Sequence, residues 1–142
     1  MTPDYMLAAV KAKETLAKYG IDSAPVNPLP IIRKQPGVLV LSFAELSSAL
    51  GVNRELLVSI CGDDNHDAVT TVQNENGKTR YLIAYNQKLP DYIVQRALAR
   101  ELGHIILRHD GSRPEDVRNE EALCFAYHFI CPCINVLQKE GY

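Results

Sequence analysis

The chain contains 142 residues, of which 46% are hydrophobic and 23% are charged. This composition is typical of a globular protein and excludes a wholly disordered chain, and the length fits a single domain over 1–142. Fifteen basic and seventeen acidic residues give a formal net charge of −2. The chain therefore lacks the basic excess that holds nucleic acid through its phosphates.

A membrane location is not expected either. No apolar run approaches the ~20 residues that a membrane-spanning helix needs. The N-terminus lacks the basic and then apolar pattern of a signal peptide. We therefore expect no membrane partner and a cytoplasmic location, in which the cysteines stay reduced. These cysteines are Cys61, Cys124, Cys131 and Cys133.

The first third of the chain predicts short elements. Helical spacing of apolar residues predicts a helix over 4–19, which Gly20 ends. The next stretch, 22–37, is rich in proline, which blocks regular structure, although Ile31–Arg33 is compatible with one helical turn. A short apolar strand is expected over Val38–Ser42.

The segment 43–60 matches a helix-turn-helix pattern, with short helices over 43–50 and 54–60 around a central glycine. A DNA-binding regulator is therefore one alternative, in which Arg54 reaches base edges or phosphates. The acidic stretch 63–67 argues against it, because its charge repels phosphate. Such units also usually need a third helix.

A β-hairpin is expected next. The β-branched run 67–73 and its partner 79–86 are separated by a turn over 74–77, and its Asn-Gly pair favours a tight hairpin. Two long helices follow. The order predicts an α+β fold, with an antiparallel or mixed sheet of about three strands packed on helices.

The two long helices are expected over 91–109 and 113–130. Apolar residues at helical spacing indicate the first. The second is expected to begin at a capping box, in which Ser112 accepts from the first turn and Glu115 reaches back.

The first long helix contains Arg100-Glu101-Leu102-Gly103-His104, which is one residue away from the zinc motif H-E-x-x-H. In that motif two His on one helical face bind zinc, and the Glu takes a proton from zinc-bound water. Arg100 cannot be a ligand, because a guanidinium has no lone pair to donate. Glu121, on the second helix, is placed to face His104.

These motifs resemble those of the ImmA/IrrE-type metallopeptidases, zincin-like proteins common in mobile elements and bacterial stress responses. The resemblance covers roughly residues 5 to 133. The stretches that carry it are Asp67–Thr70, Tyr81–Asn86, Ala99–His109, Asn119–Ala126 and Cys131-Pro132.

The resemblance implies a role for each matching residue. His104 resembles the second zinc His, Glu101 the general base and Glu121 the third zinc ligand. The chain departs from the family at two positions. Arg100 stands where the family has the first His, and Leu123 stands where it has Asn.

Three interpretations of the site stay open. In the first, a substitute ligand completes the zinc site. In the second, Arg100 replaces the metal and pairs with Glu121 or Glu101. In the third, Arg100 is a solvated surface residue and the site is vestigial. In the second case the protein is a pseudoenzyme, and Arg100→His should restore zinc binding. The candidate substitute ligands are Cys124, His109, His128 and Cys131.

The resemblance also implies a function. It indicates a zincin-like minimal metallopeptidase domain from a phage or integrated element, with a repressor-like regulator as the target. In zincins an extended peptide pairs with an edge strand of the sheet. With zinc, Glu101 would activate water and the peptide would be cleaved. Without zinc, the protein would hold the peptide uncut.

Overall fold

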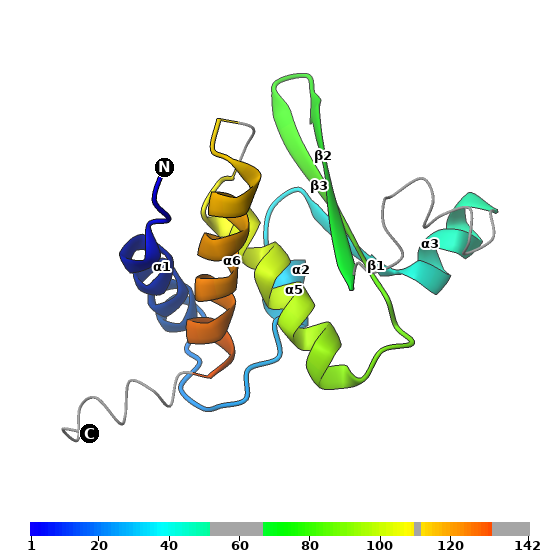
Figure 1. Cartoon of the computed structure of the whole chain (residues 1–142). Coiled ribbons are helices and arrows are strands. Elements are labelled where there is room, and N and C mark those ends of the chain that lie inside the picture. Colours follow the sequence, from blue (N-terminus) through cyan, green and yellow to red (C-terminus); the bar gives the residue numbers. More distant parts are fainter. Residues whose placement is uncertain (52–66, 110–111, 132–142) are drawn as a thin grey trace. The chain divides into compact units, whose positions relative to one another are not determined.

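A computed structural model describes residues 1–51, 67–109 and 112–131 of the chain. These residues form five helices and a three-stranded sheet (Figure 1). The predicted α+β class with a small sheet is thus confirmed. No helix in the described ranges is long and apolar enough to cross a membrane.

The fold comprises two compact units. We call Leu29–Leu98 the sheet unit, and Met1–Pro28 together with Ala99–Tyr142 the helical unit. Helix α5 (Asp91–Ile106) contributes residues to both units. All the residues of the predicted metal site belong to the helical unit, so that site can be described within the unit alone.

The sheet is mixed, with the strand order β1-β3-β2. Strand β1 (Val38–Ser42) runs parallel to β3 (Lys78–Tyr85), and β2 (Ala68–Glu75) runs antiparallel to β3. Asn76 and Gly77 join β2 to β3 with φ values of 52° and 75°. Asn and Gly tolerate this left-handed conformation better than other residues, which confirms the predicted hairpin.

Side chains are buried on both faces of the sheet. Ile83 and Ala84 are neighbours on β3, so they point to opposite faces. Ile83 is fully buried, as is Ile32 on the short helix α2 (Leu29–Arg33), which contacts β1. On the other face Ala84 packs with Phe43. The sheet unit thus has apolar side chains on each side of its central strand.

Helix α3 (Phe43–Leu50) begins with a capping box. The Glu45 backbone N–H donates to the Ser42 side chain, and the Ser42 backbone N–H donates to the Glu45 carboxylate. Gly51 ends the helix in the left-handed conformation. The first helix of the helix-turn-helix pattern is therefore present, whereas the expected second helix, 54–60, lies outside the described residues.

In the helical unit, α1 (Tyr5–Lys18) packs along α6 (Glu115–Ile130) (Figure 1). Gly103 of α5 lies against Phe125 of α6, and a Cβ added at Gly103 would lie 3.0 Å from the Phe125 ring. The missing side chain lets α5 and α6 approach closely. The buried apolar residues of this unit include Ala8, Ala12, Leu16, Leu102, Val117, Ala122, Ala126 and Phe129.

The predicted capping box of Ser112 and Glu115 is wrong. Helix α6 begins at Glu115 itself, so Pro114 occupies the N-cap position, and its side chain makes no capping hydrogen bond. The side chain of proline has no acceptor atom for the first turn. Two acidic residues in that turn, Glu115 and Asp116, stabilise the helix N-terminus instead, because their negative charges interact favourably with the helix dipole.

Helix α5 ends at Ile106, three residues earlier than predicted. Arg108 adopts φ 54°. Its N–H donates to the Ile105 carbonyl, and the His109 N–H donates to the His104 carbonyl. This pair of bonds is a Schellman motif with Arg108 in the left-handed position. The motif turns the chain back, so that His109 returns to the last turn of α5.

The contact between Gly103 and Phe125 yields a test of the packing. Gly103→Val should destabilise the protein by about 1–3 kcal/mol, because the new methyl groups meet a ring that is already in contact. Denaturant unfolding measures the loss. In a double-mutant cycle with Phe125→Leu, the loss should be less than additive. An unchanged unfolding midpoint for Gly103→Val would contradict the close approach of the two helices.

Candidate functional site

The buried carboxylate of Glu121 lies at the centre of the candidate site, and its side chain is only 4% exposed. Oε1 accepts a hydrogen bond from Arg113 Nε at 3.0 Å and lies 3.1 Å from His109 Nε2. Oε2 accepts from Arg113 Nη2 at 2.6 Å and from the Asp4 backbone N–H at 2.7 Å. Both oxygens are therefore engaged twice.

The cation that forms an ion pair with Glu121 is Arg113, whereas the sequence analysis considered Arg100 for this role. Arg113 lies in the connection before α6, and its planar fork meets the carboxylate through two nitrogens. This bidentate geometry gives the strongest hydrogen-bonded ion pairs. Arg113 is one-third exposed, so the pair links a buried acid to the surface of the helical unit.

His109 joins Glu121 to His104. Its Nδ1 lies 2.7 Å from His104 Nδ1, while its Nε2 faces the Glu121 carboxylate. The two imidazole rings meet edge to face, with centroids 4.9 Å apart. The structure therefore brings together three of the residues predicted as metal ligands, His104, Glu121 and the substitute His109.

Both histidines are neutral at physiological pH. Burial lowers the pKa of His104 to about 4, and the positive charges of Arg118 and Arg100, and of His109 when it is protonated, add to this effect. Burial also lowers the pKa of His109 and outweighs the opposing effect of its hydrogen bond and charge interaction with Glu121. Arg118 thus acts on both rings, and Arg100 acts on His104.

The carboxylate fixes the position of the protons in this chain of groups. Burial raises the pKa of Glu121, but the Asp4 N–H, Arg113 and His109 together bring it below its usual value. An ionised carboxylate only accepts hydrogen bonds, so the neutral His109 donates through Nε2. Its Nδ1 then accepts from Nδ1–H of His104. We infer that Nε2 of His104 keeps a lone pair.

In this arrangement the three side chains do not fit a zinc ion. Two nitrogens bound to one tetrahedral zinc at 2.0–2.1 Å lie about 3.3 Å apart, whereas His104 and His109 are at direct hydrogen-bond distance. His109 also turns different ring nitrogens to His104 and to Glu121, so one ion cannot join all three. Within the described ranges, no group of three or more His, Cys, Asp or Glu is arranged to hold a metal ion.

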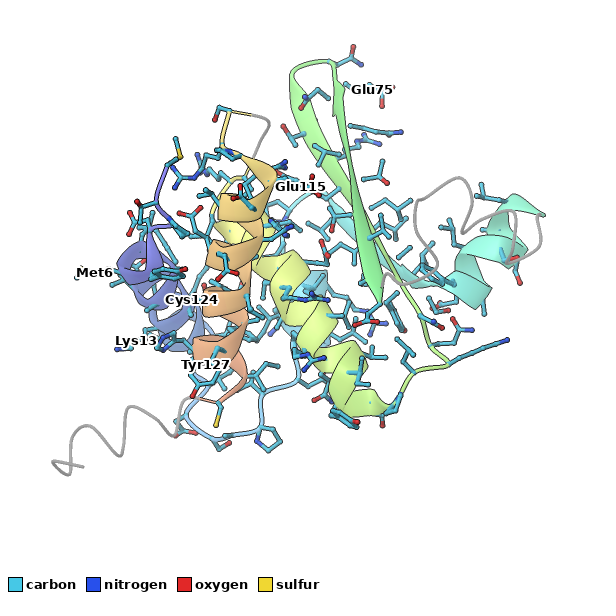
Figure 2. All side chains as sticks on the ribbon, viewed as in Figure 1. Met6, Lys13, Glu75, Glu115, Cys124 and Tyr127 are labelled. Atoms are coloured by element: carbon cyan, nitrogen blue, oxygen red, sulfur yellow. The ribbon has the colours of Figure 1, made fainter. Side chains whose placement is uncertain are left out.

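The other candidate ligands lie elsewhere on α6. Cys124 faces α1 (Figure 2), where its Sγ donates to the Tyr5 carbonyl at 3.5 Å, and burial raises the pKa of its thiol. His128 is half-buried, with its ring edge-on to Tyr127. Cys131 is half-buried directly after α6. The hydrogen bonds of Glu121 thus involve none of these three candidates.

Arg100 and Glu101 are half-buried neighbours on α5. Arg100 lies one helical turn before His104, which explains why its charge acts on that ring. The role of Glu101 as a general base stays a prediction.

No family model, curated protein or solved structure matches this chain.

The sequence interpretation missed three residues of the site: Asp4, Arg113 and Arg118. The Asp4 contact joins positions 117 residues apart, and no local pattern predicts such a contact. Arg113 was assigned only to the start of a helix. A stronger signal was available there, because an Arg so near the predicted ligand Glu121 is a natural partner for a buried acid.

The lowered pKa values predict acid destabilisation. A folded state that keeps His104 neutral binds fewer protons than the unfolded chain between pH 6.5 and about 4. Stability should therefore fall through this window as the pH falls, by up to about 3 kcal/mol from this residue alone. Unfolding free energies measured across the window provide the test.

The matched variant is His104→Gln, which removes the titrating group. The unfolding free energy of this variant should change less steeply with pH than that of the wild type. The difference in slope should correspond to about one bound proton. An identical slope in the two proteins would contradict the assignment of the effect to His104.

Proposed function

We propose that this chain is a zincin-like pseudopeptidase of the ImmA/IrrE type, which binds an extended segment of a partner protein without cleaving it. The motifs at 100–104 and 119–126 support the family. The implied partner is a repressor-like regulator in the cytoplasm, in a phage or mobile-element setting.

The bidentate pair of Arg113 and Glu121 carries the proposal. In the family, the residue at the position of Glu121 is a zinc ligand, and a ligand must offer a lone pair to the metal. Here two cationic nitrogens and the Asp4 N–H already occupy the carboxylate. Arg100 removes a second ligand position. The chain thus replaces metal coordination with an internal ion pair.

Strand β2 offers the peptide-binding edge. Of the described strands, only β3 pairs with β2, and residues 71–75 of β2 are exposed. Natural edge strands are often protected by Lys or Pro, but the sequence of β2, AVTTVQNE, contains neither. An extended peptide can pair with such an edge through main-chain hydrogen bonds.

The register identifies the groups that would bind this peptide. The Asn86 N–H donates to the Asp67 carbonyl, so these two residues form a hydrogen-bonded antiparallel pair. Direction alternates along the strand, and the backbone groups of Thr70, Val72 and Asn74 therefore point away from β3. The backbone groups of Val72 and Asn74 are the donors and acceptors that an added strand would use.

An active zinc endopeptidase is the second candidate. The observation in its favour is the convergence of His104, His109 and Glu121, which are all residue types that bind zinc. It requires Arg113 to leave Glu121 and the two rings to reorient. In that case Glu101 would act as the general base.

Zinc binding separates the two candidates. Wild type should contain far less than stoichiometric zinc. Arg100→His should as well, in contrast to the expectation from the sequence alone, because Arg113 occupies Glu121 in both proteins. The double variant Arg100→His, Arg113→Ala recovers the ligand types of the family and frees the carboxylate, so it should acquire nearly stoichiometric zinc. Mass spectrometry of protein purified without chelator measures the metal content.

Arg113→Ala alone is the control, since it frees Glu121 but leaves the first ligand position as Arg100. Stoichiometric zinc in the wild type would contradict the pseudopeptidase proposal. Peptidase assays with Glu101→Gln as the inactive control would then test the second candidate.

A proline at position 72 tests the peptide-binding edge. Val72 is 51% exposed, and its N–H points away from β3, so Val72→Pro should leave the hairpin intact. Octapeptides selected on the wild type from a random display library should bind Val72→Pro at least about tenfold more weakly. Val72→Ala keeps the N–H and should bind normally. Equal affinities in calorimetry for the two variants would exclude this edge.

A further inference from the structure

The outer side of α6 carries large apolar residues that are exposed in the described part of the chain. Leu123 is 46% exposed and Tyr127 is 59% exposed, although a helix that packs only within its own unit normally presents polar residues to solvent. We call Asp116, Glu120, Leu123 and Tyr127 the outer stripe. These residues follow one another at intervals of four, three and four, which is the heptad spacing of helices that pack side by side.

Tyr5 of α1 extends the apolar surface. Tyr5 is 48% exposed, and its hydroxyl donates to the Glu120 carboxylate at 3.3 Å. Its ring therefore lies beside the outer stripe, and the surface combines two tyrosines with a leucine. Tyrosine is enriched in protein–protein interfaces, because its ring is apolar and its hydroxyl can stay hydrated. An apolar surface rimmed by charged residues is typical of a protein interaction site.

The two ends of this surface carry opposite charges. Three acidic residues are exposed in the first half of α6, namely Glu115, Asp116 and Glu120. Lys13 of α1 is exposed at the other end, near Tyr127 (Figure 2). None of the ion pairs formed among the described residues involves these four charged side chains. Both the acids and the lysine are therefore available to a partner.

Such a surface is complementary to itself. In a two-fold dimer both copies use the same surface, and each contact occurs twice. With a second α6 packed antiparallel and the axis between Leu123 and Tyr127, Leu123 of each copy meets Tyr127 of the other. Lys13 lies at the level of Tyr127, so it comes within about one helical turn of Glu120 of the second copy. A lysine side chain spans that distance.

We propose that the outer stripe of α6, together with Tyr5 and Lys13, binds the same surface of a second copy of this chain in antiparallel orientation. The charges favour a second copy over an unrelated partner, because the acids and the lysine that must meet are both present on this one surface. The contact involves neither the Glu121 site nor strand β2. The inference therefore goes beyond the proposed function and is tested separately from it.

Charge reversal followed by mixing tests this contact. Lys13→Glu places two acids opposite each other at both symmetry-related positions, and Glu120→Lys places two lysines there. Each variant alone should therefore have a dimer dissociation constant at least about tenfold higher than the wild type in sedimentation equilibrium. An equimolar mixture restores opposite charges at both positions. The mixture should form a heterodimer about as stable as the wild-type dimer.

Two further variants complete the test. Leu123→Ser removes an apolar side chain from an exposed position, so it should weaken the dimer but leave the circular dichroism spectrum of the chain unchanged. Lys18→Glu makes the same change of charge as Lys13→Glu at another exposed position of α1. Because Lys18 lies about 140° further around the helix axis, this control should dimerise like the wild type.

Three results would overturn the proposal. The first is a wild type that stays monomeric up to about 1 mM, a range that includes weak dimers. The second is a dimer that Leu123→Ser leaves intact or that Val72→Pro abolishes, since the contact would then lie elsewhere, in the latter case at the β2 edge. The third is an equimolar mixture of Lys13→Glu and Glu120→Lys that associates no more tightly than either variant alone, which would contradict the antiparallel arrangement.

Discussion

The carboxylate of Glu121 is an ionised group in a buried position, and such a group requires partners. Its three partners come from different places in the sequence: Asp4 precedes α1, His109 follows α5, and Arg113 precedes α6. One side chain therefore ties the beginnings of two helices and the end of a third. Removing Arg113 would leave a buried charge with fewer partners, which is more costly than losing a surface pair.

Two backbone features allow this network to form. The Schellman motif around Arg108 turns His109 back towards His104. Gly103 has no side chain, so α5 can lie directly against Phe125 of α6, the helix that carries Glu121. The ion pair and the histidine contacts are thus consequences of close helix packing. Under the proposed function, exchanging metal coordination for an ion pair would need no new fold, only an arginine at the carboxylate and another at the first ligand position.

Local signals in the sequence predicted much of the fold. The strand Val38–Ser42 and the Asn-Gly hairpin depend on neighbouring residues and match the structure. The predicted end of α5 does not match the structure, because Arg108 adopts a conformation usually reserved for glycine. The sequence motifs placed His104 and Glu121 on facing helices, and the structure joins them through His109. The pairing of Arg113 with Glu121 depends on tertiary packing, which no local pattern contains.

The position of the protons on the two histidines tests the central claim most directly. Nitrogen-15 NMR of the imidazole rings distinguishes the two neutral tautomers from each other and from the charged form. If Glu121 is committed to Arg113 and His109, then at neutral pH His109 carries its proton on Nε2 and His104 on Nδ1, and added zinc leaves both spectra unchanged. A proton on Nε2 of His104, or zinc-induced shifts in both rings, would show that the Glu121 carboxylate is free to bind a metal.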